Sequence, residues 1–193
     1  MRILVVHAHP VETSFNKALF RLTVERLRNR GHEIDALDLY AEDFEPRLSS
    51  AEREAYHDTE TNRTNVSDYV ERLLAAEALV LVYPVWNYGF PAILKGWFDR
   101  IFLPGVSFAL VDGAVRPVLH NITKLVVVTT YGGSRWRTFL MGDPPRKLVN
   151  RMLRALIKPG SPVRYLTHYN LNLSTEKSRA AFMARVGNEM DRF

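Results

Sequence analysis

The sequence predicts an α/β protein built on a doubly wound parallel sheet of five strands, with helices on both faces. Three apolar runs rich in Val, Leu and Ile are typical of strands buried on both sides, at Ile3–Val6, Ala78–Tyr83 and Leu125–Thr130. Segments with helical periodicity separate the runs, and this alternation continues along the whole chain. The length of 193 residues, 47% of them hydrophobic, suits a single domain over residues 1–193.

The other elements carry weaker signals. Ile34–Leu39 and Val163–Thr167 are the two remaining strand candidates. Helical periodicity predicts helices around residues 15–22, 70–74, 94–101, 146–157 and 175–190. Ser174 is the expected N-terminal cap of the last helix, and Pro91 the expected first residue of the helix around 94–101. Polar residues 41–66 interrupt the alternation, where Ser49 and Glu52 have the spacing of a capping box on one short helix.

Composition excludes several classes of protein. The chain has no Cys, so disulfides, thiolate metal sites, iron–sulfur clusters and a Cys nucleophile are excluded. The N-terminus leads directly into the first apolar run and lacks the pattern of a signal peptide. No apolar run approaches the roughly 20 residues of a membrane helix. We therefore expect a cytoplasmic protein.

The formal net charge of +5 is unevenly distributed. The first 99 residues carry a net charge of −5 and the rest carry +10. Between Ser134 and Arg164 there are eight basic residues and one acidic residue. Such a segment suits a polyanionic ligand, which could be nucleic acid, an acidic membrane surface or a phosphate-bearing small molecule, and a solvated helix face is the alternative.

In a doubly wound sheet, ligands bind beyond the carboxyl ends of the strands, and the first loop there is His9–Asn16. It lacks the G-x-G-x-x-G pattern of a dinucleotide-binding turn. Thr13, Ser14 and Asn16 instead place polar groups at a helix N-terminus, which suits a terminal phosphate. The alternative is that Thr13 or Ser14 only caps the helix.

Two histidines, His7 and His9, lie two positions apart on one face of the first strand. A metal site needs three or four ligands, and no third ligand follows at a useful spacing, so we expect no metal. We expect His7 in the interior and His9 at the ligand crevice.

The second and third loops complete this crevice. Pro84–Phe90 places Trp86 and Tyr88 where a strand leaves the core, which favours a flat aromatic ligand over plain core packing. In Tyr131–Asp143, a pair of glycines follows a buried strand and exposes backbone N–H donors, although a tight turn explains it equally. A phosphate end, an aromatic wall and a donor edge together describe a site for flavin mononucleotide (FMN).

These residues resemble a known family, the flavodoxin-like NAD(P)H:quinone oxidoreductases. The segment Pro84–Phe102, and within it Leu94–Arg100, closely resembles the signature of that family. Val5–Pro10 with Ser14–Asn16, and Thr129–Gly133, fall where the family has its cofactor loops. The resemblance implies a flavodoxin-like sheet of strand order 2-1-3-4-5. It also implies a two-electron, ping-pong transfer of hydride from NAD(P)H through FMN to a quinone or similar planar acceptor, with FAD as the alternative flavin.

The resemblance also implies the site residues, position by position. The flavin phosphate and ribityl chain lie among His9, Thr13, Ser14, Phe15, Asn16 and Ala18. One edge of the ring lies against Pro84, Val85, Trp86, Asn87, Tyr88 and Gly89. The other edge lies against Thr130, Gly132 and Gly133, whose backbone donors stabilise negative charge on the reduced ring.

The family's members are usually homodimers, and Phe108 is similar to an aromatic residue that they present to the partner's site. Tyr131 interrupts the usual Thr-Thr-Gly-Gly, so we expect it to cover the ring and count it with Gly132 and Gly133 as catalytic. Arg135 and Trp136 complete the expected substrate pocket, and Arg135 or Arg137 is expected to hold the phosphates of NAD(P)H.

Three other functions stay open on the sequence alone. The chain is also similar to the flavin-bearing ancillary subunits of potassium efflux systems, which would give it a membrane transporter as partner. A one-electron flavodoxin carrier is disfavoured, because such carriers are usually acidic. A phospho-acceptor domain would need an Asp at the end of the third strand, where Pro84 stands instead. We expect no nucleic acid among the partners.

Overall fold

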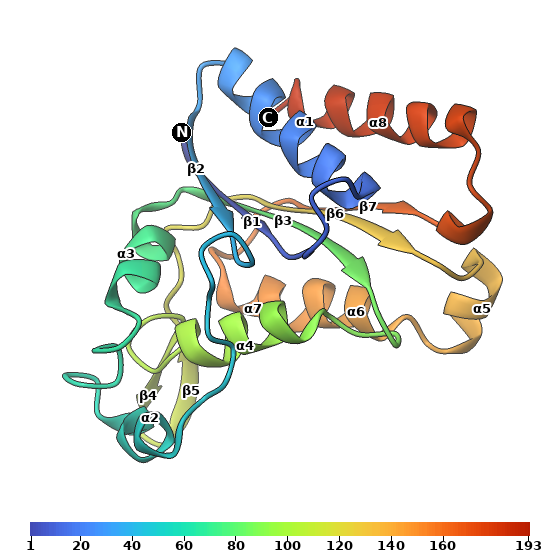
Figure 1. Ribbon diagram of the computed structural model, residues 1–193. Helices are drawn as coiled ribbons and strands as arrows, with labels where there is room; N and C mark the ends of the chain where they lie inside the picture. The colour runs from blue at the N-terminus through green and yellow to red at the C-terminus, as the bar shows by residue number, and fades with distance from the viewer.

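The computed structural model describes all 193 residues and shows a five-stranded parallel sheet between two layers of helices (Figure 1). The sheet consists of β1 (Arg2–His7), β2 (Glu33–Asp38), β3 (Ala78–Val85), β6 (Leu125–Tyr131) and β7 (Val163–His168). Their order is β2-β1-β3-β6-β7, and every neighbouring pair is parallel. All five predicted strands and the predicted order 2-1-3-4-5 are confirmed.

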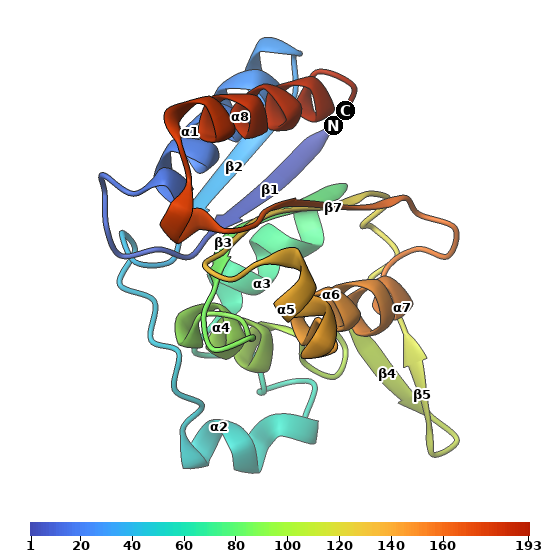
Figure 2. The ribbon, with the colours of Figure 1, turned by 90° about the vertical axis from the view of Figure 1, so that its right-hand side faces the viewer.

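Helices cover both faces of the sheet, as Figures 1 and 2 show. One face carries α1 (Phe15–Asn29) and α8 (Glu176–Met190), and the other carries α3 (Ser67–Ala75), α4 (Ala92–Ile101), α6 (Pro144–Lys147) and α7 (Arg154–Leu156). A π-helical segment, Leu148–Leu153, joins α6 to α7, so the predicted helix over 146–157 is present but widened in its middle. Two predicted caps are wrong: Thr175, not Ser174, caps α8, and Pro91 is the cap of α4, not its first residue.

The two faces of the sheet are packed into separate cores. Leu79, Leu81 and Tyr83 of β3 face the core under α3 and α4. Val80 and Val82 of the same strand face the core under α1 and α8. Burial on both faces explains why the apolar runs do not alternate with polar residues, since each buried side chain contributes about 1.5–3 kcal/mol.

Gly96 shows why the most specific part of the family signature contains a glycine. The chain segment before α2 (Ser50–Glu54) crosses α4 at this residue. A Cβ atom on Gly96 would overlap the backbone and side chain of Pro46. Only a residue without a side chain permits this crossing.

Three short elements lie outside the alternating pattern. The predicted helix with a capping box is confirmed as α2, where Ser49 and Glu52 cap each other. An antiparallel hairpin, β4 (Phe108–Val111) and β5 (Ala114–Pro117), and helix α5 (Arg135–Leu140) were not predicted. The hairpin turns at Asp112 and Gly113, and both residues have a positive φ. An Asp-Gly pair is a strong signal for a hairpin turn in a sequence. None of the helices combines the length and the apolar character needed to cross a membrane.

Candidate functional site

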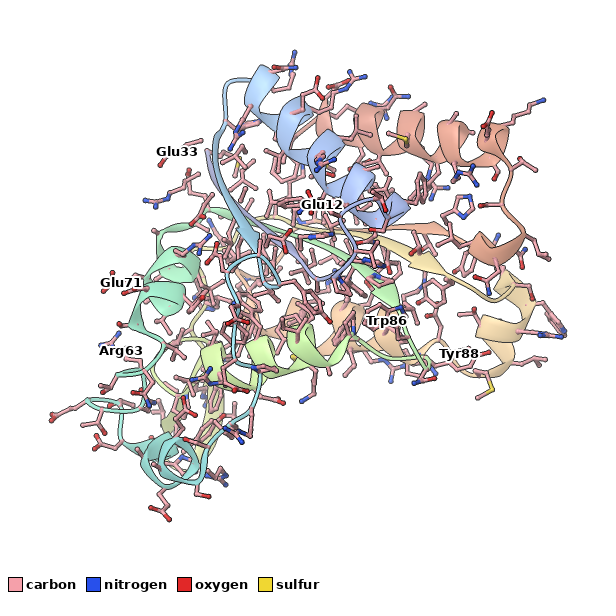
Figure 3. The ribbon with its side chains drawn as sticks, viewed as in Figure 1. Glu12, Glu33, Arg63, Glu71, Trp86 and Tyr88 are labelled. Atoms are coloured by element: carbon pink, nitrogen blue, oxygen red, sulfur yellow. The ribbon has the colours of Figure 1, made fainter.

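The loops after β1, β3 and β6 meet at the carboxyl edge of the sheet, as expected from the doubly wound topology. The rings of His9 and Trp86 lie 5.7 Å apart, which joins the first loop to the second. A cavity of about 380 Å³ touches Trp86 and Asn87 from the second loop and Thr130 and Gly132 from the third. Figure 3 shows Trp86 and Tyr88 beyond the end of β3, on the side of the molecule where α5 lies.

The loop after β1 is held by its own hydrogen bonds. Ser14 caps α1, and its hydroxyl accepts a hydrogen bond from the Lys17 N–H at 3.1 Å. His9 Nδ1 accepts one from the Val11 N–H at 3.0 Å. Ser14 therefore does cap the helix, and the N-terminal N–H groups of α1 remain directed at this loop, so the phosphate site stays a prediction.

Asn16 in the first turn of α1 is the most unusual polar residue of this loop. Its side chain is buried, and neither its amide nitrogen nor its amide oxygen has a hydrogen-bond partner within the protein. Leaving such groups unpaired costs about 1–3 kcal/mol each. Phe15 and Ala18 beside it are half-buried, and Thr13 is exposed.

A cluster of interacting polar and charged side chains lies next to the same loop. It consists of Lys17, Asp38, Glu12 and His7, and we call it the paired cluster. Lys17 Nζ donates to Asp38 Oδ2 and lies 2.8 Å from Glu12 Oε2. His7 Nδ1 lies 2.9 Å from Asp38 Oδ2, and the His7 side chain is fully buried. The expectation that His7 lies in the interior is confirmed.

The pKa values in the paired cluster follow from burial and pairing. Burial opposes the charged forms of Lys17 and Asp38, but the hydrogen bonds and charges of their partners together outweigh it, so the pKa of Lys17 is raised and that of Asp38 is lowered. For His7, burial outweighs the attraction of Asp38 and lowers the pKa. At neutral pH the cluster therefore holds one ammonium group between two carboxylates, beside a neutral imidazole.

The loop after β3 forms a tight turn with unusual backbone angles. Trp86 and Gly89 exchange two backbone hydrogen bonds, of 3.2 and 2.8 Å. Between them, Asn87 and Tyr88 both have positive φ, +48° and +56°, in the region that glycine usually occupies. Strain of this kind is concentrated at functional sites. The turn leaves Trp86 40% exposed while Pro84 before it is buried.

The loop after β6 presents backbone rather than side chains. Gly133 has open space where a Cβ atom would be, and the nearest atom to a Cβ on Gly132 is Asn172 Nδ2 at 3.2 Å. Thr130 is buried, and its hydroxyl has no partner in the protein.

Tyr131, which follows Thr130 in this loop, is held by hydrogen bonds to its neighbours. Its side chain is buried, and its hydroxyl donates to Asp143 Oδ1 at 2.6 Å and lies 3.0 Å from the Tyr165 hydroxyl. Burial raises the pKa of Tyr131, and the neighbouring Tyr165 and Asp143 raise it further. Tyr131 also lines a cavity with Tyr88, Gly132 and Gly133, so the expectation that its ring covers the ligand stays a prediction.

The residues expected in the substrate pocket do not come together within one chain. Phe108 starts the hairpin and lines an apolar cavity of about 520 Å³ with Phe98 and Phe102. Arg135 lines a different cavity, at the end of β7. Trp136 is 66% exposed and stacks on Phe139.

The loop after β7 also contributes to the crevice, although it was not among the predicted loops. Leu171 and Asn172 line the same cavity as Trp86 and Thr130. Asn170 in this loop donates its N–H to the Gly133 carbonyl at 2.9 Å. The topology rule would have selected this loop too, because it follows the carboxyl end of the fifth strand. No group of three or more His, Cys, Asp or Glu side chains is arranged to hold a metal ion.

Comparison with known proteins assigns the family. A family model described as the flavodoxin-like fold matches residues 1–186. The chain is 31% identical to NAD(P)H dehydrogenase (quinone) 1 of Rattus norvegicus over 150 residues, covering 69% of this chain and 54% of the relative. It is 30% identical to an uncharacterized NAD(P)H oxidoreductase, YcaK, of Escherichia coli K12, covering 73% of this chain and 69% of the relative.

These matches show that the chain belongs to the flavodoxin-like fold family, and its curated homologues include NAD(P)H dehydrogenases that act on quinones. It spans only about half the length of the rat enzyme. Among solved structures, an NAD(P)H:quinone oxidoreductase of Methanothermobacter marburgensis has a TM-score of 0.83 at 24% identity, with 99% of this chain and 98% of the other covered. An FMN-dependent NADH-azoreductase of Bacillus anthracis, solved in complex with FMN, has a TM-score of 0.79 at 17% identity, with 99% and 98% covered. At these identities the likeness of the structures concerns the fold.

Proposed function

We propose that this protein is a flavin-dependent NAD(P)H:quinone oxidoreductase that binds FMN at the carboxyl edge of its sheet, with FAD as the alternative flavin. The observation that carries the proposal is the set of unpaired donors and acceptors in the crevice. Asn16 and Thr130 are buried without partners, one on each side of the edge. Gly132 and Gly133 add a stretch of backbone without side chains, with the Asn172 side chain near Gly132 and open space beside Gly133. These groups fit the phosphate, ribityl and ring atoms of FMN.

Bound FMN would supply the two-electron chemistry, taking hydride from NAD(P)H and passing it to a quinone in a ping-pong sequence. The chain's own residues bind and orient. The N-terminus of α1, capped by Ser14, favours the phosphate dianion. Trp86 and the turn at Asn87 and Tyr88 provide a wall for the ring. The N–H groups of Gly132 and Gly133 act as fixed donors to negative charge at the ring edge.

Flavin occupancy tests the binding site. Trp86→Ala and Ser14→Ala should each lower the flavin absorbance of the purified protein relative to wild type. Trp136→Ala is the matched control, because Trp136 is an exposed tryptophan outside the crevice, so its occupancy should stay at the wild-type value. Equal occupancy in all three variants would place the flavin elsewhere, and a wild-type protein that binds no added FMN would end the proposal.

Turnover tests the donor role of the glycine pair. A Cβ at Gly133 meets no atom within 4 Å, so Gly133→Val should keep the fold while its branched side chain blocks approach to the backbone N–H. We expect NADPH oxidation to fall by about 10²-fold, the usual effect of losing one fixed donor. Unchanged oxidation with full flavin occupancy would remove this pair from catalysis.

We also propose a homodimer, formed through the apolar cavity beside Phe108. The cavity is lined mainly by hydrophobic residues of α4, the hairpin and the segment around Met152. The adjoining hairpin leaves Leu110, Val111 and Val115 exposed, an apolar surface that a second copy would cover. Val115→Lys should therefore halve the mass measured by analytical ultracentrifugation, and a wild type that sediments as one chain would contradict the dimer.

A second candidate function is an ancillary subunit of a potassium efflux system. The observation favouring it is the apolar end of α5, where Trp136 and Phe139 are stacked and about two-thirds exposed. If a transporter covers this surface, detergent-solubilised membranes should yield an integral membrane protein on immobilised wild type and not on Phe139→Glu. Recovery by both, or by neither, would leave the free enzyme as the function.

A further inference from the structure

A second cavity, of about 890 Å³, lies beside the crevice at the carboxyl end of β7, and we call it the cationic cavity. Helix α5, the segment from α6 into the π-helical turn, strand β7 and helix α8 contribute to its wall. The wall has one carboxylate, Asp143, and five cationic side chains: Arg135, Arg146, Lys147, Arg151 and Arg185.

Both oxygens of the single carboxylate already accept hydrogen bonds from neighbouring side chains. Asp143 Oδ2 accepts a hydrogen bond from Arg146 Nε at 2.7 Å, and its Oδ1 accepts one from the Tyr131 hydroxyl at 2.6 Å. Arg146 also donates to the Tyr169 hydroxyl at 2.8 Å. Asp143 and Arg146 thus form a neutral pair that belongs to the wall, and four cations remain without a carboxylate within 4.0 Å, namely Arg135, Lys147, Arg151 and Arg185.

Arg185 is an exposed member of this group of cations. Its guanidinium lies 4.8 Å from the centre of the Phe182 ring and donates only to a backbone carbonyl, that of Thr167, at 2.8 Å. Partial burial lowers the pKa of Arg185, although Tyr169 opposes the shift. Several cations that share one cavity repel one another, and an anion bound between them would relieve that repulsion.

The backbone of the wall is also irregular at this point. Asn150 and Arg151, which line the cavity, both lie in the π-helical turn Leu148–Leu153. Single turns of this kind are frequent at functional sites. Asp143, at the start of α6, has a positive φ of +46°, which is uncommon for a residue other than glycine.

The cationic cavity and the crevice share one wall. Arg135 and Phe139 of α5 line the cavity, while Arg137 and Thr138 of the same helix line the crevice side with Gly132. Tyr131 lies on the crevice side, and its ring centre is 5.1 Å from that of Tyr169 in the cavity wall. A ligand that extends out of the crevice past α5 therefore reaches the cations.

We propose that the cationic cavity binds the 2′-phosphate of NADPH and makes the enzyme prefer NADPH to NADH. A phosphate monoester carries a charge of about −1.5 to −2 and three strong acceptor oxygens, and Arg recognises it by paired hydrogen bonds. NADH has a hydroxyl group at the same place and would leave the cations unpaired. The inference rests on the proposed function, since it takes NAD(P)H as the reductant.

Steady-state kinetics with both nucleotides test the preference. Arg151→Ala and Lys147→Ala should each raise KM for NADPH about tenfold, the effect of losing one charged hydrogen bond, and leave KM for NADH unchanged. Arg154→Ala is the matched control, because Arg154 is an exposed cation just beyond the π-helical turn and outside the cavity. It should change neither constant.

A binding measurement separates failure of this inference from failure of the proposed function. Calorimetry should show adenosine 2′,5′-bisphosphate binding more tightly than adenosine 5′-monophosphate to wild type, and about equally to Arg151→Ala. This readout needs no turnover, so it stands even if the protein oxidises neither nucleotide. Equal affinity of wild type for the two probes, or equal loss of NADPH and NADH turnover in the cavity variants, would overturn the assignment to the 2′-phosphate.

Discussion

Two charged regions flank the crevice. The charges of the first are paired within the protein, and most of those of the second are not. In the paired cluster under the first loop, Lys17 is buried between the carboxylates of Asp38 and Glu12. In the cationic cavity at the end of β7, four cations have no carboxylate partner. Charges that are paired inside the protein hold the backbone in place, whereas unpaired charges in a cavity are available to a ligand. Removing a charge should therefore cost stability in the first region and ligand affinity in the second.

Asp38→Asn should have the largest effect on stability. The substitution removes the carboxylate that pairs with Lys17 and His7, leaving the Lys17 side chain buried with only Glu12 beside it. Breaking a buried ion pair costs about 3–5 kcal/mol, so the free energy of unfolding in urea should fall by that amount. Asp191→Asn is the control: Asp191 pairs with Arg26 on the surface, and its loss should cost less than about 1 kcal/mol. Equal costs would remove the contrast.

The fold could be predicted because its signals are local. β1, β3 and β6 read as strands from their own apolar runs, which are buried on both faces. The hairpin β4–β5 was missed because its strands have four residues each and are mostly exposed, so no buried periodicity marks them. Its Asp112-Gly113 turn was the available signal.

The site could be predicted only in part, because its details depend on long-range contacts. The three loops follow from topology, but Asp38 is 21 and 31 residues from its partners Lys17 and His7, and in the sequence it resembles a surface residue. The inward direction of Tyr131 depends on which face of β6 it occupies. The basic segment was visible as composition, yet only the structure separates Arg151, which lines the cavity, from Arg154, which does not.

Ionic strength should distinguish the two regions without any substitution. The Debye length falls from about 30 Å at 0.01 M to about 10 Å at 0.1 M salt, and exposed charges are screened far more than buried ones. Raising the salt concentration over this range should raise KM for NADPH several-fold while the free energy of unfolding changes little. An equal salt response of KM for NADH would show that the effect is not specific to the extra phosphate.

Arg151→Glu should have a small effect on stability, of the opposite sign to that of Asp38→Asn. The new carboxylate would stand among the unpaired cations of the cavity and relieve their repulsion. Surface substitutions of this kind change stability by about 0.5 kcal/mol, so we expect an equal or slightly higher midpoint in urea unfolding. A loss of stability as large as that of Asp38→Asn would mean that Arg151 has a structural partner.

The smallest expected effect is the contribution of His7 to the pH dependence of the free energy of unfolding. Burial lowers the pKa of His7 below its ordinary value of 6.5 in the folded protein, although Asp38 opposes the shift. Between these two pKa values the unfolded chain binds the proton and the folded chain does not, so the free energy of unfolding should fall as the pH drops below 6.5. His9, His32 and His168 shift in the same direction, so the contribution of His7 is the difference between wild type and His7→Gln. If the imidazole of His7 instead titrates above 6.5 by NMR, it is a cation in the folded protein, and the paired cluster carries one more positive charge than its contacts indicate.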